Sequence, residues 1–138
     1  MSGNMEKHDS YTLAYDRITS ALKQGFPLEA IAIEESILAD RLFSYLTYKN
    51  EKIDIEKTSL GTLVCKAKNL STDFEANIYS QLDQWRKHRN KMLHGIVKSV
   101  PGTAPETKAD DFIPEATKLA EEGLTLTRIV QDWQRRQK

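Results

Sequence analysis

The 138-residue chain has little of what would place it in several common protein classes. Its single cysteine, Cys65, excludes an internal disulfide and a cysteine-based zinc cluster. No apolar run approaches the length that spans a bilayer and no signal peptide is visible, so we expect a cytoplasmic protein with no membrane partner. Twenty Lys and Arg residues balance twenty Asp and Glu residues, so any attraction to nucleic acid must be local.

Metal-ligand spacing is also absent from the sequence. The acidic groups "EES" and "AEEG" are too short to hold a metal, and no His–x–x–Glu pair stands at ligand spacing. We therefore predict no metal and no other cofactor. Cys65 is predicted to be a small buried hydrophobe, with a reactive thiol as the alternative.

Apolar residues recur with a helical period, and no segment alternates as a strand would. We expect one domain over residues 10–136, preceded by a disordered polar tail over residues 1–9. The predicted fold class is all-α, an antiparallel bundle of four to five helices with short connections.

Local signals place the first helices. Ser10 is a candidate cap for a helix that ends at Gly25. Pro27 suits the first turn of a long second helix over residues 27–48. A charged, turn-like stretch follows, and residues 60–70 are apolar enough to form a short helix.

The second half of the chain predicts two further helices. A capping box from Thr72 to Glu75 precedes a third long helix that runs to about Gly95. Residues 99–111 contain two prolines and a glycine and are predicted to be a loop. The last helix is expected from about Pro114 to Gln134.

Two charged residues interrupt the apolar stripes of the long helices. Arg89 falls near the centre of a stripe on the third long helix that holds Ile78, Leu82, Trp85, Met92 and Ile96. Glu35 falls near the centre of the stripe on the second helix that holds Leu28, Ile31, Leu38, Leu42 and Leu46. An unpaired charge in a core costs several kcal/mol, so we predict that Glu35 meets Arg89. The alternative is that Arg89 extends its head to solvent.

A second row of polar residues lies beside Arg89. Arg86, Asn90 and His94 are four apart, so they share the flank of the stripe. On an ideal helix Arg89 and His94 are about 140° apart. They converge on one small ligand only if the helix loosens near Gly95 or a second subunit contributes.

The second helix also favours a dimer. Ile33 and Ile37 form an apolar patch on the side away from Leu28 and Leu42. A helix that is apolar on two sides needs two partners, and a second subunit is one candidate.

Residues 89–94, "RNKMLH", resemble the R-N-x-x-x-H signature of the HEPN superfamily, the higher eukaryotes and prokaryotes nucleotide-binding domain. Members are small all-α bundles in which the motif ends a late helix. The preceding "DQWRKHRN" is similar to the acidic–x3–Lys–x–Arg lead-in of many catalytic members, with Asp83, Lys87 and Arg89 in those places. The acid of the lead-in is usually Glu, so Asp83 is a small departure.

The resemblance implies a metal-independent endoribonuclease that acts as a homodimer, with the two motifs facing each other. Arg89 would bind the scissile phosphate, His94 would move protons, and Asn90 would orient His94 or the phosphate. The flanking RNA backbone would be held by Arg86, Lys87 and Lys91. Such proteins are often toxins of toxin–antitoxin or antiphage defence systems, so an antitoxin or other protein partner is expected.

Other functions are open on the same residues. Members of the superfamily also serve as non-catalytic dimerisation or binding modules, and His94 near a helix C-terminus is favoured by the helix dipole alone. A small-nucleotide sensor that uses the same basic crevice is a third hypothesis. His88 is predicted to be solvent-facing, and Trp85 and Trp133 are predicted to lie in the core.

Overall fold

The computed structural model describes residues 2–70, 76–95, 101 and 109–137, and these residues form five helices and no strand. The helices are α1 (Ser2–Gln24), α2 (Pro27–Tyr48), α3 (Leu60–Leu70), α4 (Ala76–Gly95) and α5 (Ala109–Arg135). The predicted all-α bundle is confirmed for this part of the chain, and none of its helices is long and apolar enough to cross a membrane.

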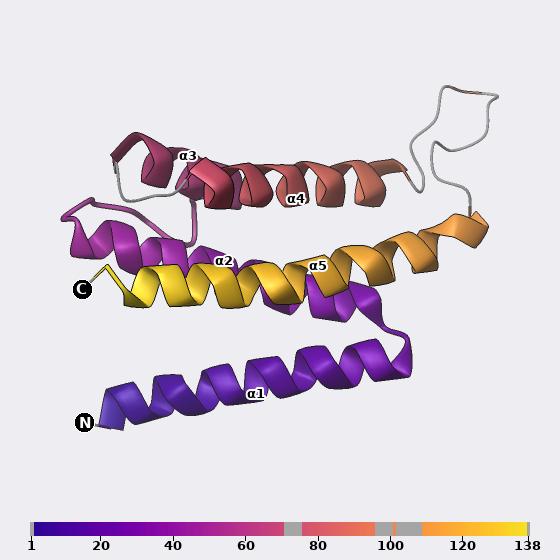
Figure 1. The fold of residues 1–138 in the computed structure, drawn as a ribbon, viewed down its shortest axis with the longest axis horizontal. Helices are drawn as coiled ribbons and strands as arrows, with labels where there is room; N and C mark the ends of the chain where they lie inside the picture. The colour runs from indigo at the N-terminus through magenta and orange to yellow at the C-terminus, as the bar shows by residue number, and fades with distance from the viewer. Residues whose placement is uncertain (1, 71–75, 96–100, 102–108, 138) are drawn as a thin grey trace.

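The two central helices, α2 and α5, run in the same direction (Figure 1). Glu34 lies beside Gly123, and further along Arg41 contacts Gln134, as expected for parallel helices. α1 covers one side of this pair, and α3 and α4 cover another (Figure 1). The antiparallel prediction holds for α1 with α2 and for α4 with α5. It is wrong for α2 and α5, because α4 reverses the chain between them.

The turn between α1 and α2 has the backbone pattern that glycine favours. Gly25 adopts φ +80°, its N–H donates to the Leu22 carbonyl at 3.3 Å, and the Phe26 N–H donates to the Ala21 carbonyl at 2.8 Å. This is a Schellman motif, which satisfies the last carbonyls of α1. Pro27 then occupies the first turn of α2, as predicted.

α2 ends in the same way without a glycine. Asn50 adopts φ 66°, and the Glu51 N–H donates to the Leu46 carbonyl at 2.9 Å. The charged stretch up to Ser59 is non-helical, as expected. Ser59 then caps α3, because its Oγ accepts from the Thr62 N–H at 3.2 Å.

The start of α1 differs from the prediction. The helix begins at Ser2, so the segment expected to be a disordered tail over residues 1–9 is helical from residue 2. Ser10 is not a cap, and its hydroxyl donates to the Glu6 carbonyl at 3.0 Å. Lys7 anchors this turn through an ion pair with Asp40 at 3.0 Å.

The start of α5 is also earlier than predicted. The helix begins at Ala109, with Asp110 and Asp111 in its first turn, where carboxylates favour the helix dipole. Pro114 lies inside the helix, and Phe112, which precedes it, is buried in the core. Because Phe112 packs into the core, its burial favours the helical turn on the N-terminal side of Pro114. The capping box at 72–75 and most of the loop expected over 99–111 lie outside the described residues.

The core confirms most of the predicted stripes. Trp85 and Trp133 are buried, and so are the stripe residues Ile31, Leu38, Leu42, Leu46, Ile78, Leu82 and Met92. Leu28 is 41% exposed, and Ile96 lies outside the described residues. Cys65, expected to be buried, is exposed on the outer side of α3.

Replacing Gly25 by Ala should lower the free energy of unfolding by about 1–2 kcal/mol, because an L side chain is strained at this φ. The added Cβ meets nothing within 4 Å, so the loss comes from the backbone alone. Urea denaturation measures it, with the exposed Gln24→Ala change as the control. Equal stability of the two variants would contradict the left-handed conformation of Gly25.

Candidate functional site on helix α4

α4 separates its residues onto an inner apolar face and an outer basic face. Ile78, Leu82, Trp85 and Met92 are buried, whereas Lys87, His88, Lys91 and His94 are exposed. Asn90 is half-buried between the two faces. We call Arg86, Lys87, Asn90, Lys91 and His94 the basic row.

The predicted pairing of Glu35 with Arg89 is confirmed. The Arg89 Nη2 lies 2.7 Å from the Glu35 Oε1, and the two side chains are 18% and 32% exposed. The backbones of α2 and α4 do not pack directly, so these long side chains bridge the helices. The Arg89 Nε is buried without a hydrogen-bond partner among the described residues. Arg89 therefore points inward, and the alternative of a solvent-facing head is excluded.

Asp83 holds two cations of the basic row. Its Oδ1 lies 2.8 Å from the Arg86 Nη2, and its Oδ2 lies 2.9 Å from the Lys87 Nζ. The hydrogen bond from Arg86, followed by that from Lys87, lowers the pKa of the Asp83 carboxyl. The guanidinium of Arg86 also lies against α3, where a Cβ on Gly61 would approach it to 3.2 Å.

The structure does not bring all six predicted site residues together within one chain. α4 is helical through Gly95, so the helix does not loosen between Arg89 and His94. Arg89 is directed at α2, whereas His94 is exposed and makes no contact with a charged partner among the described residues. A site that uses both groups on one phosphate therefore needs a second copy of the chain.

The apolar patch of Ile33 and Ile37 has its second partner within the same chain. Ile37 is buried, Ile33 packs against the core, and both line a crevice between α2 and α1 together with the α1 residues Ala14 and Tyr11. The two-sided apolar character of α2 is thus explained by α1. This patch carries no argument for a dimer.

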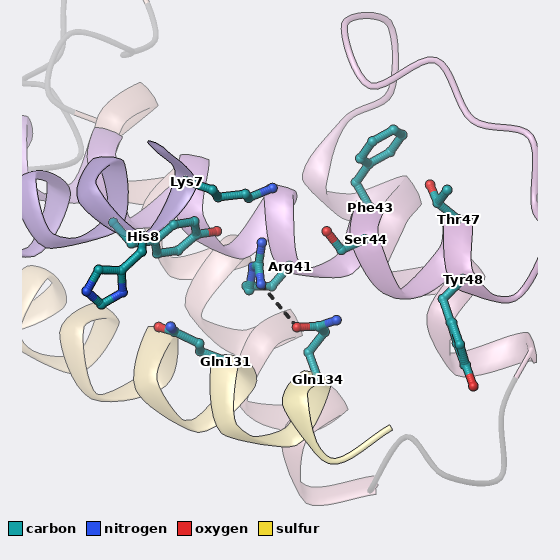
Figure 2. A pocket seen from close by; sticks show the side chains of 10 residues that line it. Lys7, His8, Arg41, Phe43, Ser44, Thr47, Tyr48, Gln131 and Gln134 are labelled. Carbon is teal, nitrogen blue, oxygen red and sulfur yellow. Dashed lines mark hydrogen bonds between the residues drawn. The ribbon is translucent and has the colours of Figure 1, made fainter. Parts of the chain in front are cut away.

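The sequence did not indicate a hollow of about 610 Å³ where α1, the second half of α2 and the end of α5 meet (Figure 2). Lys7, Arg41, Ser44 and Gln134 are among its lining residues. They come from three helices and are far apart in the chain, so no local motif marks the hollow.

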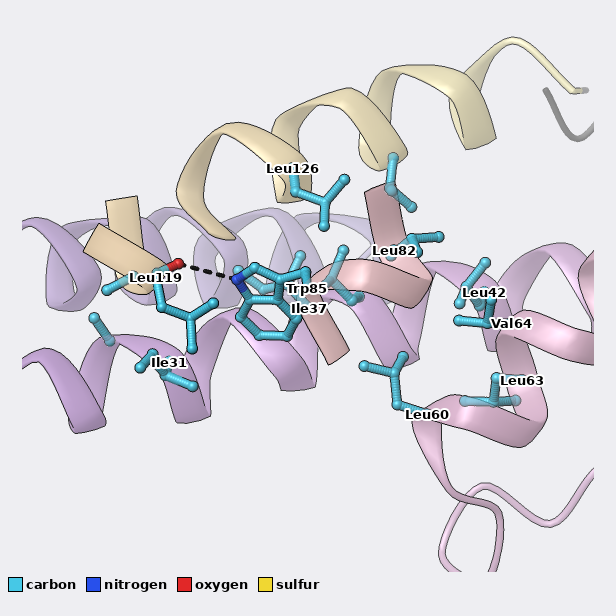
Figure 3. Packing of buried hydrophobic residues seen from close by; sticks show 14 of the residues in the cluster. Ile31, Ile37, Leu42, Leu60, Leu63, Val64, Leu82, Trp85, Leu119 and Leu126 are labelled. Atoms are coloured by element: carbon cyan, nitrogen blue, oxygen red, sulfur yellow. Dashed lines mark hydrogen bonds between the residues drawn. The ribbon is translucent and has the colours of Figure 1, made fainter. Parts of the chain in front are cut away.

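Sequence periodicity also missed Glu34, which is 0% exposed in the core. Neither of its carboxyl oxygens has a hydrogen-bond partner among the described residues. A Cβ on Gly123 would lie 2.2 Å from the Glu34 Oε1 and 2.9 Å from the Trp85 Cζ2. Trp85 is fixed beside it by an indole N–H that donates to the Leu119 carbonyl at 3.0 Å (Figure 3).

Burial without a partner raises the pKa of Glu34 to about 9. The carboxyl is therefore neutral in the folded protein near pH 7, and its low-energy form is the acid. The two adjacent glutamates thus differ in environment. Glu34 is buried, whereas Glu35 is half-exposed and paired with Arg89.

Comparison of the chain with protein-family models, with curated proteins and with solved structures finds no match. The HEPN resemblance therefore rests on residues 83–94 and on their place at the end of a helix in a small helical bundle.

Replacing Glu34 by Met should stabilise the protein increasingly as pH rises from 5 to 8. Above pH 4.5 the unfolded chain loses the Glu34 proton, whereas the folded chain keeps it until about pH 9. The Glu34 contribution to stability therefore falls by about 1.4 kcal/mol per pH unit across this range, and the variant lacks that loss. Urea denaturation at several pH values measures the difference, with exposed Glu121→Met as the control. A pH-independent difference would refute the neutral carboxyl.

Glu35 and Arg89 should be energetically coupled by roughly 1 kcal/mol, because their ion pair is only partly exposed. A double-mutant cycle of Glu35→Gln and Arg89→Met, followed by urea denaturation, measures the coupling. The same cycle on Asp132 and Arg135, a largely exposed pair at 3.4 Å, should give a smaller value. Equal couplings in the two cycles would show that burial of the Arg89 pair adds nothing.

Proposed function

We propose that the protein is a metal-independent endoribonuclease of HEPN type that acts as a homodimer. The observation that carries this proposal is that the motif residues Arg89 and His94 lie on different sides of α4. His94 lies on the outer surface beside exposed Lys91, and Arg89 is turned toward α2 and paired with Glu35. An exposed imidazole among cations is suited to proton transfer on a polyanion, because its ring nitrogens can both accept and donate a proton.

In the proposed reaction the 2′-oxygen of a ribose attacks the adjacent phosphorus and the bond to the 5′-oxygen breaks. His94 takes the proton from the 2′-hydroxyl and returns it to the leaving 5′-oxygen. The products are a 2′,3′-cyclic phosphate and a free 5′-hydroxyl. Asn90, one helical turn before His94, orients the imidazole or the phosphate.

Arg89 stabilises the charge that gathers on the phosphate in this proposal. Its Nη2 is engaged by Glu35 and its Nε is buried, so Nη1 is the group that would contact a phosphate oxygen of the RNA. Arg89 and His94 diverge within one chain, so Arg89 of one copy would act with His94 of the other. Arg86, Lys87 and Lys91 bind the flanking backbone, with Asp83 fixing the first two.

A toxin of a toxin–antitoxin or antiphage defence system is the biological setting that this activity favours, because uncontrolled RNA cleavage stops growth. The antitoxin or other inhibitor would cover the basic row. Its acidic surface would complement Lys87, Lys91 and His94, which are exposed.

One observation favours a second candidate function, a non-catalytic homodimeric binding module. Arg89 is already paired with Glu35 and its Nε is buried, which are properties of a structural arginine. In that case the basic row is an interface for another protein and no RNA is cut.

Replacing His94 by Ala should reduce RNA cleavage in EDTA by roughly 10²–10⁴-fold, because general acid–base catalysis is lost. Gel analysis of a labelled RNA measures the rate, and the product ends are tested for the cyclic phosphate. His88→Ala is the matched control, since His88 is an exposed histidine of the same helix and lies outside the basic row. It should cut at the rate of the unchanged protein.

His94 is the better probe than Arg89, because Arg89→Ala also breaks the ion pair to Glu35. Full activity of His94→Ala would reject the assigned role. A stable dimer in sedimentation that cuts no RNA would support the binding module. A monomer that cuts RNA would reject the shared site.

A further inference from the structure

The carboxylate and amide oxygens beside the hollow between α1, α2 and α5 accept hydrogen bonds from donors of the same chain. The Asp40 carboxylate accepts from Tyr11, from Lys7 at 3.0 Å and from the Arg41 Nη2 at 2.6 Å. The Gln134 Oε1 accepts from the Arg41 Nη1 at 3.1 Å. Arginine has only donors, so this bond fixes the orientation of the Gln134 amide, whose NH2 group has no partner among the described residues.

The side-chain NH2 groups of two glutamines of α5, Gln131 and Gln134, remain as hydrogen-bond donors at the hollow. The Gln131 Oε1 accepts from the Tyr15 hydroxyl at 2.7 Å, and the Gln131 NH2 group has no partner within the part of the chain that the structure describes. Gln134 is only 3% exposed and lines the hollow, so its amide borders that space. Figure 2 shows Gln131, Gln134 and Arg41 around the same space.

Two hydroxyls of α2 add to this set. Several threonine and serine hydroxyls of the described helices donate to the carbonyl one turn back, as Thr12 and Thr19 do. Ser44 and Thr47 line the hollow and make no such bond within the described part of the chain. Both hydroxyls are therefore available to a ligand.

The charge of the hollow agrees with its donors. Its lining residues include Lys7 and Arg41 but no Asp or Glu. Asp40 behind them offsets one positive charge, so the set carries a net charge of about +1. The aromatic ring of Tyr48, 53% exposed, stands at the rim. The hollow thus presents donors and positive charge at its floor and an aromatic surface at its edge.

We propose that this hollow binds a small organic phosphate. A phosphate monoester offers several acceptor oxygens and negative charge to the donors of Lys7, Arg41, Gln134, Ser44 and Thr47. Its organic part lies against Tyr48. No residue of α4 lines the hollow, so the site is independent of the proposed nuclease and persists whether or not RNA is cut.

Calorimetry with phenyl phosphate, inorganic phosphate and phenol tests the site on the full chain. Phenyl phosphate should bind with saturation, inorganic phosphate about tenfold more weakly, and phenol not at all, because anion and ring both contribute. In NMR spectra the side-chain NH2 resonances of Gln131 and Gln134 should shift with the same affinity. If phenyl phosphate shows no saturable binding while an oligonucleotide binds and shifts the same glutamine resonances, the small-molecule assignment is overturned.

Three changes locate the binding. Lys7→Met should weaken phenyl phosphate about tenfold, since a charge-assisted hydrogen bond is lost. Ser44→Ala with Thr47→Val should weaken it several-fold at unchanged charge, and Tyr48→Ala should weaken the ester but not inorganic phosphate. Lys118→Met and Thr19→Val, exposed positions outside the hollow, are the matched controls. Loss in the controls equal to that in the site variants would overturn the proposal.

Discussion

The parallel packing of α2 along α5 is the contact on which the other helices depend. α1 and α3 attach to α2, and α4 attaches to α5 (Figure 1). The pair also creates the places where polar groups are buried. Glu34 lies where the helices approach through Gly123, and Arg41 reaches Gln134 further along. Hydrophobic burial sets the register of α2 and α5, and that register decides which polar residues are enclosed.

Local chemistry allowed much of this fold to be predicted from the sequence. Pro27 and the glycine before it define the start of α2, and the bounds predicted for α2 and α3 agree with the structure. The pairing of Glu35 with Arg89 followed from two charges in apolar stripes, because a buried charge needs a partner. These features depend on residues close in sequence or on a strong energetic penalty.

Features that arise from distant contacts could not be predicted. The first turns of α1 are polar, and Lys7 is anchored by Asp40, which is remote in sequence. Helical periodicity did not identify Glu34 as the buried acid beside Glu35, because α2 is covered by α1, α3 and α5 and little of it faces solvent. The hollow between three helices carries no motif, because its lining runs from Lys7 to Gln134.

The absence of a side chain at Gly123 has a consequence for how this fold tolerates change. The space that a Cβ would fill is occupied by the Glu34 carboxyl and the edge of the Trp85 ring. The two positions therefore share one fixed volume across the α2–α5 contact. In any chain with this architecture, a larger residue at the α5 position requires a smaller one on α2, so the two sites would evolve as a size-exchanging pair.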